Sequence, residues 1–371
     1  MFAFLLAVPA LAADDESEKA AVMPPQAMHV IHISVDGLRA DAVTRRSPED
    51  LPNLYRLRNE GAFTDNARTD FYRSNTLPNH TSQLTGRAVL GPNGHGWTKN
   101  SDPEPGETLH SHHGEYVASV FDVVHDNGLS TALYTTKSKF VLFDQSYDGV
   151  NGAPDLVRAD NGRDKIDRFH YDSDTETVVD AFVRDVEREQ YDYAFVHLRD
   201  PDSAGHRFNW NMRSGSSYLS SIERVDRLVG QILETVTSTP GLAGNTVIIL
   251  TSDHGGGGSF HNHGDPAHIE NYTIPFYVWG FGIAPSELYA LNGETRLHPG
   301  MSRPDYEAAG QPVRNGDAAN LALAHLGLPA VPGSTLNAAF DLRAFRADDI
   351  PSPSIAEETR EAPDTATASA R

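Results

Sequence analysis

The chain of 371 residues contains no cysteine. A disulfide, a thiolate zinc site and a cysteine nucleophile are therefore excluded, and any bound metal must be held by Asp, Glu, His or hydroxyl groups. Basic residues are also scarce, because 30 Lys and Arg stand against 51 Asp and Glu, which gives a formal charge of -21. Such a surface argues against a broad nucleic-acid-binding face. It does not exclude a small phosphorylated substrate, because bound cations can reverse the local field.

Long apolar runs are missing too. No stretch approaches the ~20 apolar residues that are needed to span a bilayer, so we expect no membrane span. The apolar run at residues 2–8 is short, and Ala10-Leu11-Ala12 behind it has the pattern of a cleavage site, although no Lys or Arg precedes the run. We expect a signal peptide over residues 1–12 and a periplasmic or secreted mature protein. A disordered or buried N-terminus is the alternative.

Short β-branched or apolar runs alternate with stretches of helical spacing. The pattern predicts strands at 29–35, 129–136, 191–198, 246–250 and 274–279, and helices at 51–60, 115–127, 175–189, 217–236 and 316–326. This alternation predicts an α/β fold with a central, largely parallel β-sheet flanked by helices on both faces.

One domain accounts for most of the chain. We expect a flexible lead-in at 13–27, a catalytic domain at 28–346 with surface excursions at 144–173 and 281–315, and a disordered tail at 347–371, where Ser, Thr, Ala, Pro and acidic residues prevail. The sequence does not indicate the oligomeric state.

The stretch from Arg73 to Gly86 places a hydroxyl residue, Thr76, two residues before Pro78 and at the start of an apolar-periodic run. Proline suits the first turn of a helix. Thr76 would then lie among free backbone N–H groups at the positive end of the helix dipole, where a group that meets a phosphate belongs. A helix cap without chemistry is the alternative.

Polar residues also follow three of the expected strands: Asp36, Asp202 with His206, and Asp253 with His254. Each alone can be a cap or a turn, but the carboxyl ends of parallel strands meet at one edge of a sheet, so all should converge. Carboxylates and imidazoles without thiols suit Zn²⁺ first among divalent ions. Two such ions ~4 Å apart would polarise a phosphoryl oxygen and lower the pKa of a hydroxyl or water. Metal contact would remove the need for a general base to ionise Thr76.

Four motifs occur in a fixed order: Asp36-Gly37, Asn75-Thr-Leu-Pro-Asn79, Pro201-Asp202-x-x-x-His206 and Ser252-Asp-His-Gly255. Together they resemble the alkaline phosphatase superfamily, closest to its type I phosphodiesterase/nucleotide pyrophosphatase branch and to related phosphonate hydrolases. The resemblance covers about residues 28–280. It departs from the sulfatases, because no formylglycine can form, and from classical alkaline phosphatase, whose nucleophile is serine.

The resemblance implies a nucleophilic Thr76 and two metal sites. The first would be held by Asp36, Thr76, Asp253 and His254, and the second by Asp202, His206 and a later histidine. For that later histidine His263 is the first choice, because it precedes Gly-Asp-Pro, with His261 second and His268 a distant third.

Three further roles complete the expected site. Asn100 closes a His-Gly loop and resembles the Asn that holds the oxyanion in this branch, and the N–H of Leu77 at the helix start should join it. Lys137 and Lys139 resemble a K-x-K pair that monoester- and phosphonate-hydrolysing relatives direct at the substrate. A solvated lysine pair is the alternative. His80 and His95 are expected to be structural.

These expectations combine into a function. We expect an exported, metal-dependent hydrolase of phosphoric esters that acts on a small phosphorylated substrate through a phosphothreonine. The lysine pair favours phosphate monoesters, which carry two negative charges. The alternatives are a phosphodiesterase or nucleotide pyrophosphatase, a phosphonate or sulfate ester hydrolase, and a non-catalytic binding protein. A cytoplasmic mutase of the same superfamily is disfavoured by the signal-like start.

Overall fold

The computed structural model describes residues 23–159, 162–257 and 261–346. The expected signal peptide, most of the lead-in and the tail at 347–371 lie outside these ranges. Of the lead-in, residues 23–27 are described, and the Ala27 N–H donates to the His325 carbonyl at 2.7 Å. No helix of the described chain is long and apolar enough to cross a bilayer.

A single eight-stranded sheet forms the centre of the molecule, in the order β4-β3-β5-β1-β6-β7-β2-β8. Its strands are β1 (His29–Val35), β2 (Ala62–Arg68), β3 (Thr131–Thr135), β4 (Arg168–Tyr171), β5 (Tyr193–Leu198), β6 (Thr246–Thr251), β7 (Thr273–Gly280) and β8 (Ser286–Glu287). The strands run parallel except β7, which is antiparallel to both of its neighbours. The expected largely parallel α/β sheet is confirmed.

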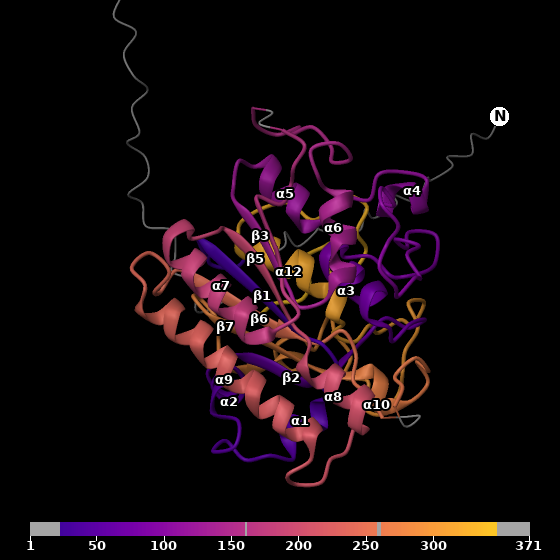
Figure 1. Cartoon of the computed structure of the whole chain (residues 1–371), viewed down its shortest axis with the longest axis vertical. Coiled ribbons are helices and arrows are strands. Elements are labelled where there is room, and N and C mark those ends of the chain that lie inside the picture. Colours follow the sequence, from indigo (N-terminus) through magenta and orange to yellow (C-terminus); the bar gives the residue numbers. More distant parts are fainter. Residues whose placement is uncertain (1–22, 160–161, 258–260, 347–371) are drawn as a thin grey trace, which may run out of the picture.

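Helices cover both faces of this sheet (Figure 1). One apolar core lies between the sheet and α1 (Ala40–Thr44), α2 (Pro52–Glu60), α7 (Thr175–Glu189) and α9 (Ser217–Ser238). The other lies beneath α3 (Thr76–Thr85), α5 (Val120–Asp126), α6 (Val141–Ser146) and α12 (Ala318–His325). The shorter elements are α4 (Leu109–His113), η1 (Ser138–Phe140), α8 (Asp200–Phe208), α10 (Ile269–Tyr272), α11 (Leu288–Leu291) and η2 (Asn315–Asp317). Residues of β1 alternate between the two cores, since Val30 belongs to one and Ile31 to the other.

The structure differs from the sequence pattern at several places. The helix expected from residue 115 begins only at Val120, because Ser119 and Asp122 form a capping box there. β2 was not expected, and its register shifts between Thr64 and Ala67, which breaks the period-2 alternation that reveals a strand. β4 lies inside the expected excursion at 144–173 and pairs with β3 at the edge of the sheet, where its side chains remain partly or fully exposed. The excursion at 281–315 likewise contains β8 and α11.

Candidate active site

The ends of the three central strands bring the expected polar residues together. β5, β1 and β6 lie side by side in parallel register, so Asp36, Asp202 and Asp253 leave the sheet at the same edge. Backbone contacts join the segments: the Asp202 N–H donates to the Asp36 carbonyl at 3.0 Å, and the Gly37 N–H donates to Asp253 Oδ1 at 3.1 Å. Asp202 and His206 lie on α8, one helical turn apart, and therefore face the same way.

Two groups of ligand-type side chains result. Asp36, Asp253 and His254 form the first cluster, and Asp202, His206 and His263 form the second; within each cluster the ligand atoms lie within 4.8 Å of one another. We call these the Asp253 cluster and the Asp202 cluster. The rings of His254 and His263 stack with centroids 3.5 Å apart, so the two clusters are adjacent.

The hydrogen bonds of His254 and His263 direct the Nε2 atom of each ring toward a position where a divalent cation could bind. His254 Nδ1 donates to the Gly255 carbonyl at 2.8 Å, and His263 Nδ1 donates to the Ser74 carbonyl at 2.5 Å. Burial lowers the pKa of His254 to about 3 and also lowers that of His263, so both rings are neutral and each Nε2 carries a lone pair.

Those lone pairs face carboxylate oxygens. His254 Nε2 lies 3.1 Å from Asp253 Oδ2, and His263 Nε2 lies 3.5 Å from Asp202 Oδ1. These two oxygens and Asp36 Oδ1 are buried and have no hydrogen-bond donor among the described residues. Two hydrogen-bond acceptors that face each other in a buried site cost free energy unless a cation lies between them. Carboxylate oxygens and imidazole nitrogens together are ligands that suit Zn²⁺.

Lys137 already joins the two clusters. Its Nζ lies 2.5 Å from Asp36 Oδ2 and 2.6 Å from Asp202 Oδ2, and its side chain is 11% exposed. Burial on its own lowers the pKa of this lysine, but the surrounding aspartates raise it well above the ordinary value. Burial would raise the pKa of Asp36, yet Lys137 and His197 hold it well below its usual range. The pKa of Asp253 is raised by burial and by the charge of Asp36.

Thr76 begins α3 at the mouth of these clusters, behind Asn75 as the cap residue, as the sequence predicts. Its Oγ1 lies 3.5 Å from Lys137 Nζ and 3.4 Å from His254 Nε2. The side chain of His80, one turn into the helix, bridges the Thr76 carbonyl and Ser34 Oγ at 2.8 Å each. Thr76 is therefore fixed at the end of a buried helix with its hydroxyl toward both clusters.

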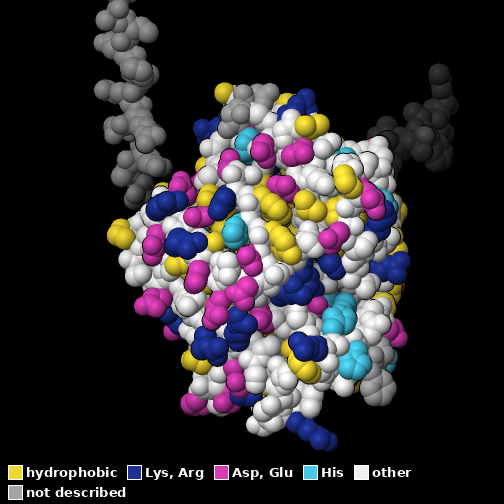
Figure 2. All heavy atoms as spheres, viewed as in Figure 1, with side chains coloured by type: hydrophobic (Ala, Val, Ile, Leu, Met, Phe, Trp, Pro, Cys, Tyr) yellow, Lys and Arg dark blue, Asp and Glu magenta, His cyan; other side chains and the backbone are white. Residues whose placement is uncertain are grey.

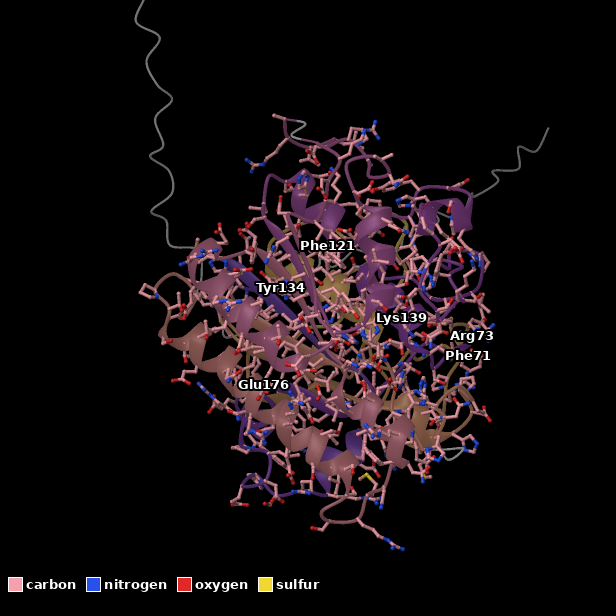
Figure 3. The ribbon with its side chains drawn as sticks, viewed as in Figure 1. Phe71, Arg73, Phe121, Tyr134, Lys139 and Glu176 are labelled. Atoms are coloured by element: carbon pink, nitrogen blue, oxygen red, sulfur yellow. The ribbon has the colours of Figure 1, made fainter. Side chains whose placement is uncertain are left out.

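Asn100 lies next to the same helix end. Its Oδ1 accepts from the Leu77 N–H at 3.0 Å and from Lys139 Nζ at 3.2 Å, and Lys139 also donates to its carbonyl at 2.6 Å. Two donors on Oδ1 fix the amide, so that its N–H₂ group faces away from them. Lys139 thus contacts Asn100, whereas Lys137 contacts the carboxylates. Figure 3 labels Lys139 beside α3, and it labels Arg73 beside Phe71 in the loop before this helix.

The structure separates the two candidate histidines. His263 is buried and its Nε2 lies 3.1 Å from His206 Nε2. His261 is exposed; its carbonyl accepts from His206 Nδ1 at 2.7 Å, and its ring is not part of either cluster. His268 pairs with Asp265 at 3.5 Å instead. Figure 2 shows histidine side chains at the surface beside Lys and Arg, over the region of α8 and α10.

Sequence reasoning missed two residues of this region. His197 on β5 donates from Nε2 to Asp36 Oδ2 at 2.9 Å and contacts Thr136 Oγ1 through Nδ1 at 2.8 Å, so it orients a ligand. A lone histidine near the carboxyl end of an apolar strand was the available signal. Trp210 packs beside the imidazoles of both clusters, and no local pattern indicates this.

A third group, of His125, Asp126 and Asp155, has the residue types of a metal site. The buried Lys165 fills it, with Nζ 3.2 Å from Asp126 Oδ1 and 3.4 Å from His125 Nδ1, and it also contacts Asp155. The lysine ammonium supplies the cation here, so this group ties the 144–173 region to α5.

Comparison with known proteins identifies the family. The model of the type I phosphodiesterase / nucleotide pyrophosphatase family matches residues 30–274. The chain belongs to this family. The resemblance seen in the sequence is therefore confirmed, and with it the membership of a metal-dependent group of phosphoric ester hydrolases in the alkaline phosphatase superfamily.

Individual relatives match shorter stretches. A 2,3-bisphosphoglycerate-independent phosphoglycerate mutase of Thermococcus gammatolerans is 28% identical over 115 residues, which is 31% of this chain and 24% of the mutase. The GPI ethanolamine phosphate transferase 1 of Chaetomium globosum is 35% identical over 95 residues, which is 26% of this chain and 10% of the transferase. The chain thus matches about a quarter or less of these proteins.

Solved structures share the fold over most of the chain. Murine ectonucleotide pyrophosphatase / phosphodiesterase 5, in an inactive form in complex with AMP, has a TM-score of 0.56 at 15% identity, covering 85% of this chain and 99% of its own. A lipoteichoic acid synthase from Listeria monocytogenes has a TM-score of 0.56 at 14% identity, covering 85% of this chain and 76% of its own. These similarities establish the alkaline phosphatase-like fold.

Proposed function

We propose that this protein is a two-metal phosphoric ester hydrolase that acts through a phosphothreonine on Thr76 and prefers phosphate monoesters. The observation that carries the proposal is the position of Thr76 Oγ1, 3.4 Å from His254 of the Asp253 cluster and 3.5 Å from the lysine that contacts Asp202. A hydroxyl at a helix N-terminus between two sets of metal-type ligands is arranged for attack on phosphorus.

Each residue has a defined role in this proposal. The Asp253 cluster and the Asp202 cluster would hold one divalent ion each, with zinc the first choice. Bound there, the ions supply positive charge that lowers the pKa of the Thr76 hydroxyl and polarises the phosphoryl group. The N–H₂ group of Asn100 donates to a phosphoryl oxygen, oriented by the contacts of its Oδ1 with Leu77 and Lys139.

The reaction then has two displacements. The Thr76 hydroxyl gives up its proton to water as its oxygen forms a bond to phosphorus. The bond to the ester oxygen breaks at the same time, and the departing alcohol takes a proton from water. A water oxygen next attacks the phosphothreonine, which releases phosphate and returns the Thr76 hydroxyl. The buried position of Thr76 at the start of α3 holds its Oγ1 in one orientation for both steps.

Lys137 supports the preference for monoesters. A monoester presents two negative charges and three non-bridging oxygens, and a lysine ammonium near the nucleophile is a competent partner for the extra charge. A diester carries one charge and a second organic group, for which a cation offers little. Lys137 Nζ lies within 3.5 Å of Thr76 Oγ1, close to where the phosphoryl group must bind.

A phosphodiesterase or nucleotide pyrophosphatase is the second candidate function, and the family match favours it. The murine relative named above binds AMP in its inactive form. The fold alone does not separate the two, because both reactions use the same attack on phosphorus.

Lys137→Ala distinguishes these functions. We predict that this variant loses hydrolysis of nitrophenyl phosphate at least ten times more than hydrolysis of bis-nitrophenyl phosphate, since one charge-assisted contact contributes about 1.5–3 kcal/mol. The ratio of the two kcat/KM values is the measurement. Metal content is determined in parallel, because Lys137 contacts Asp36 and Asp202. Equal losses on both substrates at normal metal content would favour the diesterase.

The cellular location and the extent of the mature protein belong to the same proposal. We infer an exported protein that is cleaved after residue 12, with a catalytic domain at 28–346. N-terminal sequencing and intact mass of protein recovered from the periplasm or medium test this, and an uncleaved cytoplasmic product would contradict it.

A further inference from the structure

One bulky side chain packs against both metal-type clusters. Trp210 follows the end of α8, and its side chain is buried although its neighbours Asn209 and Asn211 are exposed. Asn209 adopts φ 62°, a left-handed value that is uncommon outside glycine, and the chain turns back at this residue. The turn carries the indole beneath the site instead of into solvent.

Three glycines leave the space that the indole fills. A Cβ atom built on Gly37 would lie 2.7 Å from Trp210 Cη2, one on Gly205 would lie 2.4 Å from Cε2, and one on Gly256 would lie 2.3 Å from Cδ2. No real Cβ approaches a ring atom this closely, so any larger residue would displace the indole.

Each of these glycines adjoins the expected ligands. Gly37 follows Asp36 directly, Gly205 precedes His206 directly, and Gly256 lies two residues after His254. They come from three separate segments, after β1, within α8 and after β6. The indole therefore contacts the backbone of all three segments that carry ligands from the sheet edge.

The indole also lies beside three imidazoles. Its ring centroid is 6.2 Å from that of His206, 6.0 Å from that of His263 and 6.4 Å from that of His254, with the rings steeply inclined to one another. Two of these histidines belong to the Asp202 cluster and one to the Asp253 cluster. Trp210 Nε1 is buried without a hydrogen-bond partner among the described residues, so the contribution of this residue is its shape.

We propose that Trp210 is a positioning residue that fixes the imidazoles of both clusters and so sets the affinity for divalent metal, above all in the Asp202 cluster. The inference rests on the proposed function in one respect, namely that the clusters hold metal. The physical basis is packing: an imidazole that is already held in its binding orientation loses less conformational entropy when it binds a cation. His206 needs this support most, because its side chain is 45% exposed.

Zinc affinity of the purified protein, measured by competition with a chromophoric chelator, tests the inference. Wild type should bind two zinc ions. Trp210→Ala should lower the zinc affinity of the weaker site about 10–100-fold, the range typical of residues that orient metal ligands. Trp210→Phe should restore part of this affinity. Trp279→Ala is the matched control, because Trp279 pairs with Ile248 away from the carboxyl end of β6. The zinc affinity of this variant should equal that of wild type.

A double-mutant cycle separates positioning from general damage. Gly205→Ala keeps the indole but places a Cβ 2.4 Å from it, so it should weaken zinc binding by a similar factor. In the Trp210→Ala background the indole atoms nearest to that Cβ are gone, and the double variant should bind zinc no worse than Trp210→Ala alone. Thermal unfolding in the presence of chelator reports whether each variant folds. If Trp210→Ala does not fold, the zinc affinities of Trp210→Phe and Gly205→Ala decide the test.

The outcomes are distinct. Wild type that binds no zinc would overturn the proposed function and this inference together. Wild type that binds two ions, with Trp210→Ala and Trp210→Phe binding as tightly, would overturn the inference alone. Fully additive losses in the cycle would also overturn it, because they would show that Gly205 and Trp210 act separately.

Discussion

Asn100 and Lys139 illustrate how a single side chain is given its orientation in this site. An amide has two ends, and the Leu77 N–H and the Lys139 ammonium both bind the oxygen end. The nitrogen end is the one that would donate to a phosphoryl oxygen in the proposed mechanism. In this account Lys139 acts through Asn100, whereas Lys137 acts near the nucleophile itself.

Replacement of Asn100 by alanine should therefore slow the chemical step. We predict a fall in kcat of about 10²–10³-fold, the usual cost of a lost oxyanion donor, with a smaller change in KM. Steady-state kinetics on nitrophenyl phosphate measure both. Asn93→Ala, at an exposed asparagine of the same loop, is the control and should behave as wild type. A fall in kcat of less than threefold for Asn100→Ala would remove Asn100 from the proposed oxyanion contacts.

At the scale of elements, helix α3 and the loop before it form one unit. Asn79, in the first turn of α3, accepts from the Asp70 N–H at 2.9 Å and donates to the carbonyls of Arg73 and Asn75 at 2.9 and 3.0 Å. Its Oδ1 also accepts from Asn315 Nδ2 at 3.0 Å. This one buried amide ties residues 70–75 to the helix that carries Thr76.

Asn79→Ala should loosen that unit. Buried groups that lose their partners cost about 1–3 kcal/mol, so we predict a loss of that size in the free energy of unfolding, together with a lower kcat. Urea unfolding measures the first and steady-state kinetics the second. Asn127→Ala, whose side chain makes only a local bond to the Val123 carbonyl in the described chain, should cost less stability and leave kcat unchanged. Equal effects of the two changes would contradict the role of Asn79.

Elements with a regular pattern were predictable, and interrupted ones were not. β1, β5 and β6 are uniformly buried runs of apolar and β-branched residues, and their signal is local. β2 carries Asp65 and Asn66 at its register shift, and β4 has no buried side chain. Pairing with neighbours, which a single sequence does not display, makes these two segments strands.

At the scale of the whole molecule, topology explains why a site could be predicted at all. Parallel strands deliver their carboxyl ends to one edge, so Asp36, Asp202 and Asp253 meet without further information. The fit of Trp210 among Gly37, Gly205 and Gly256 depends on distances between segments far apart in the chain, and no spacing rule encodes it. The same holds for the contact between His197 and Asp36.

The buried histidines make stability depend on pH. Burial lowers the pKa of His32 on β1 to about 3, whereas an unfolded histidine titrates near pH 6.5. Between these values the unfolded chain binds a proton that the native protein does not, so the free energy of unfolding falls as the pH falls, by up to about 1.4 kcal/mol per pH unit. Above pH 6.5 this group has no further effect.

His32→Gln should therefore flatten the pH dependence. We predict that the free energy of unfolding of this variant changes less steeply between pH 4 and 6 than that of wild type. The two slopes should differ by the contribution of about one bound proton, which is up to about 1.4 kcal/mol per pH unit. Urea unfolding at a series of pH values supplies both slopes. A slope equal to that of wild type would show that His32 does not titrate differently in the two states.

The central claim is that Thr76 attacks phosphorus, and the most direct measurement is acid quenching of the enzyme during turnover of a phosphate monoester, followed by peptide mass spectrometry. We predict one phosphoryl group on the peptide that contains Thr76, present without chelator and absent with it. Thr76→Ala should fold, bind metal, carry no phosphoryl group and show no turnover, while Thr76→Ser keeps part of the activity. Turnover by Thr76→Ala at a rate near that of wild type would contradict the account and assign the attack to water.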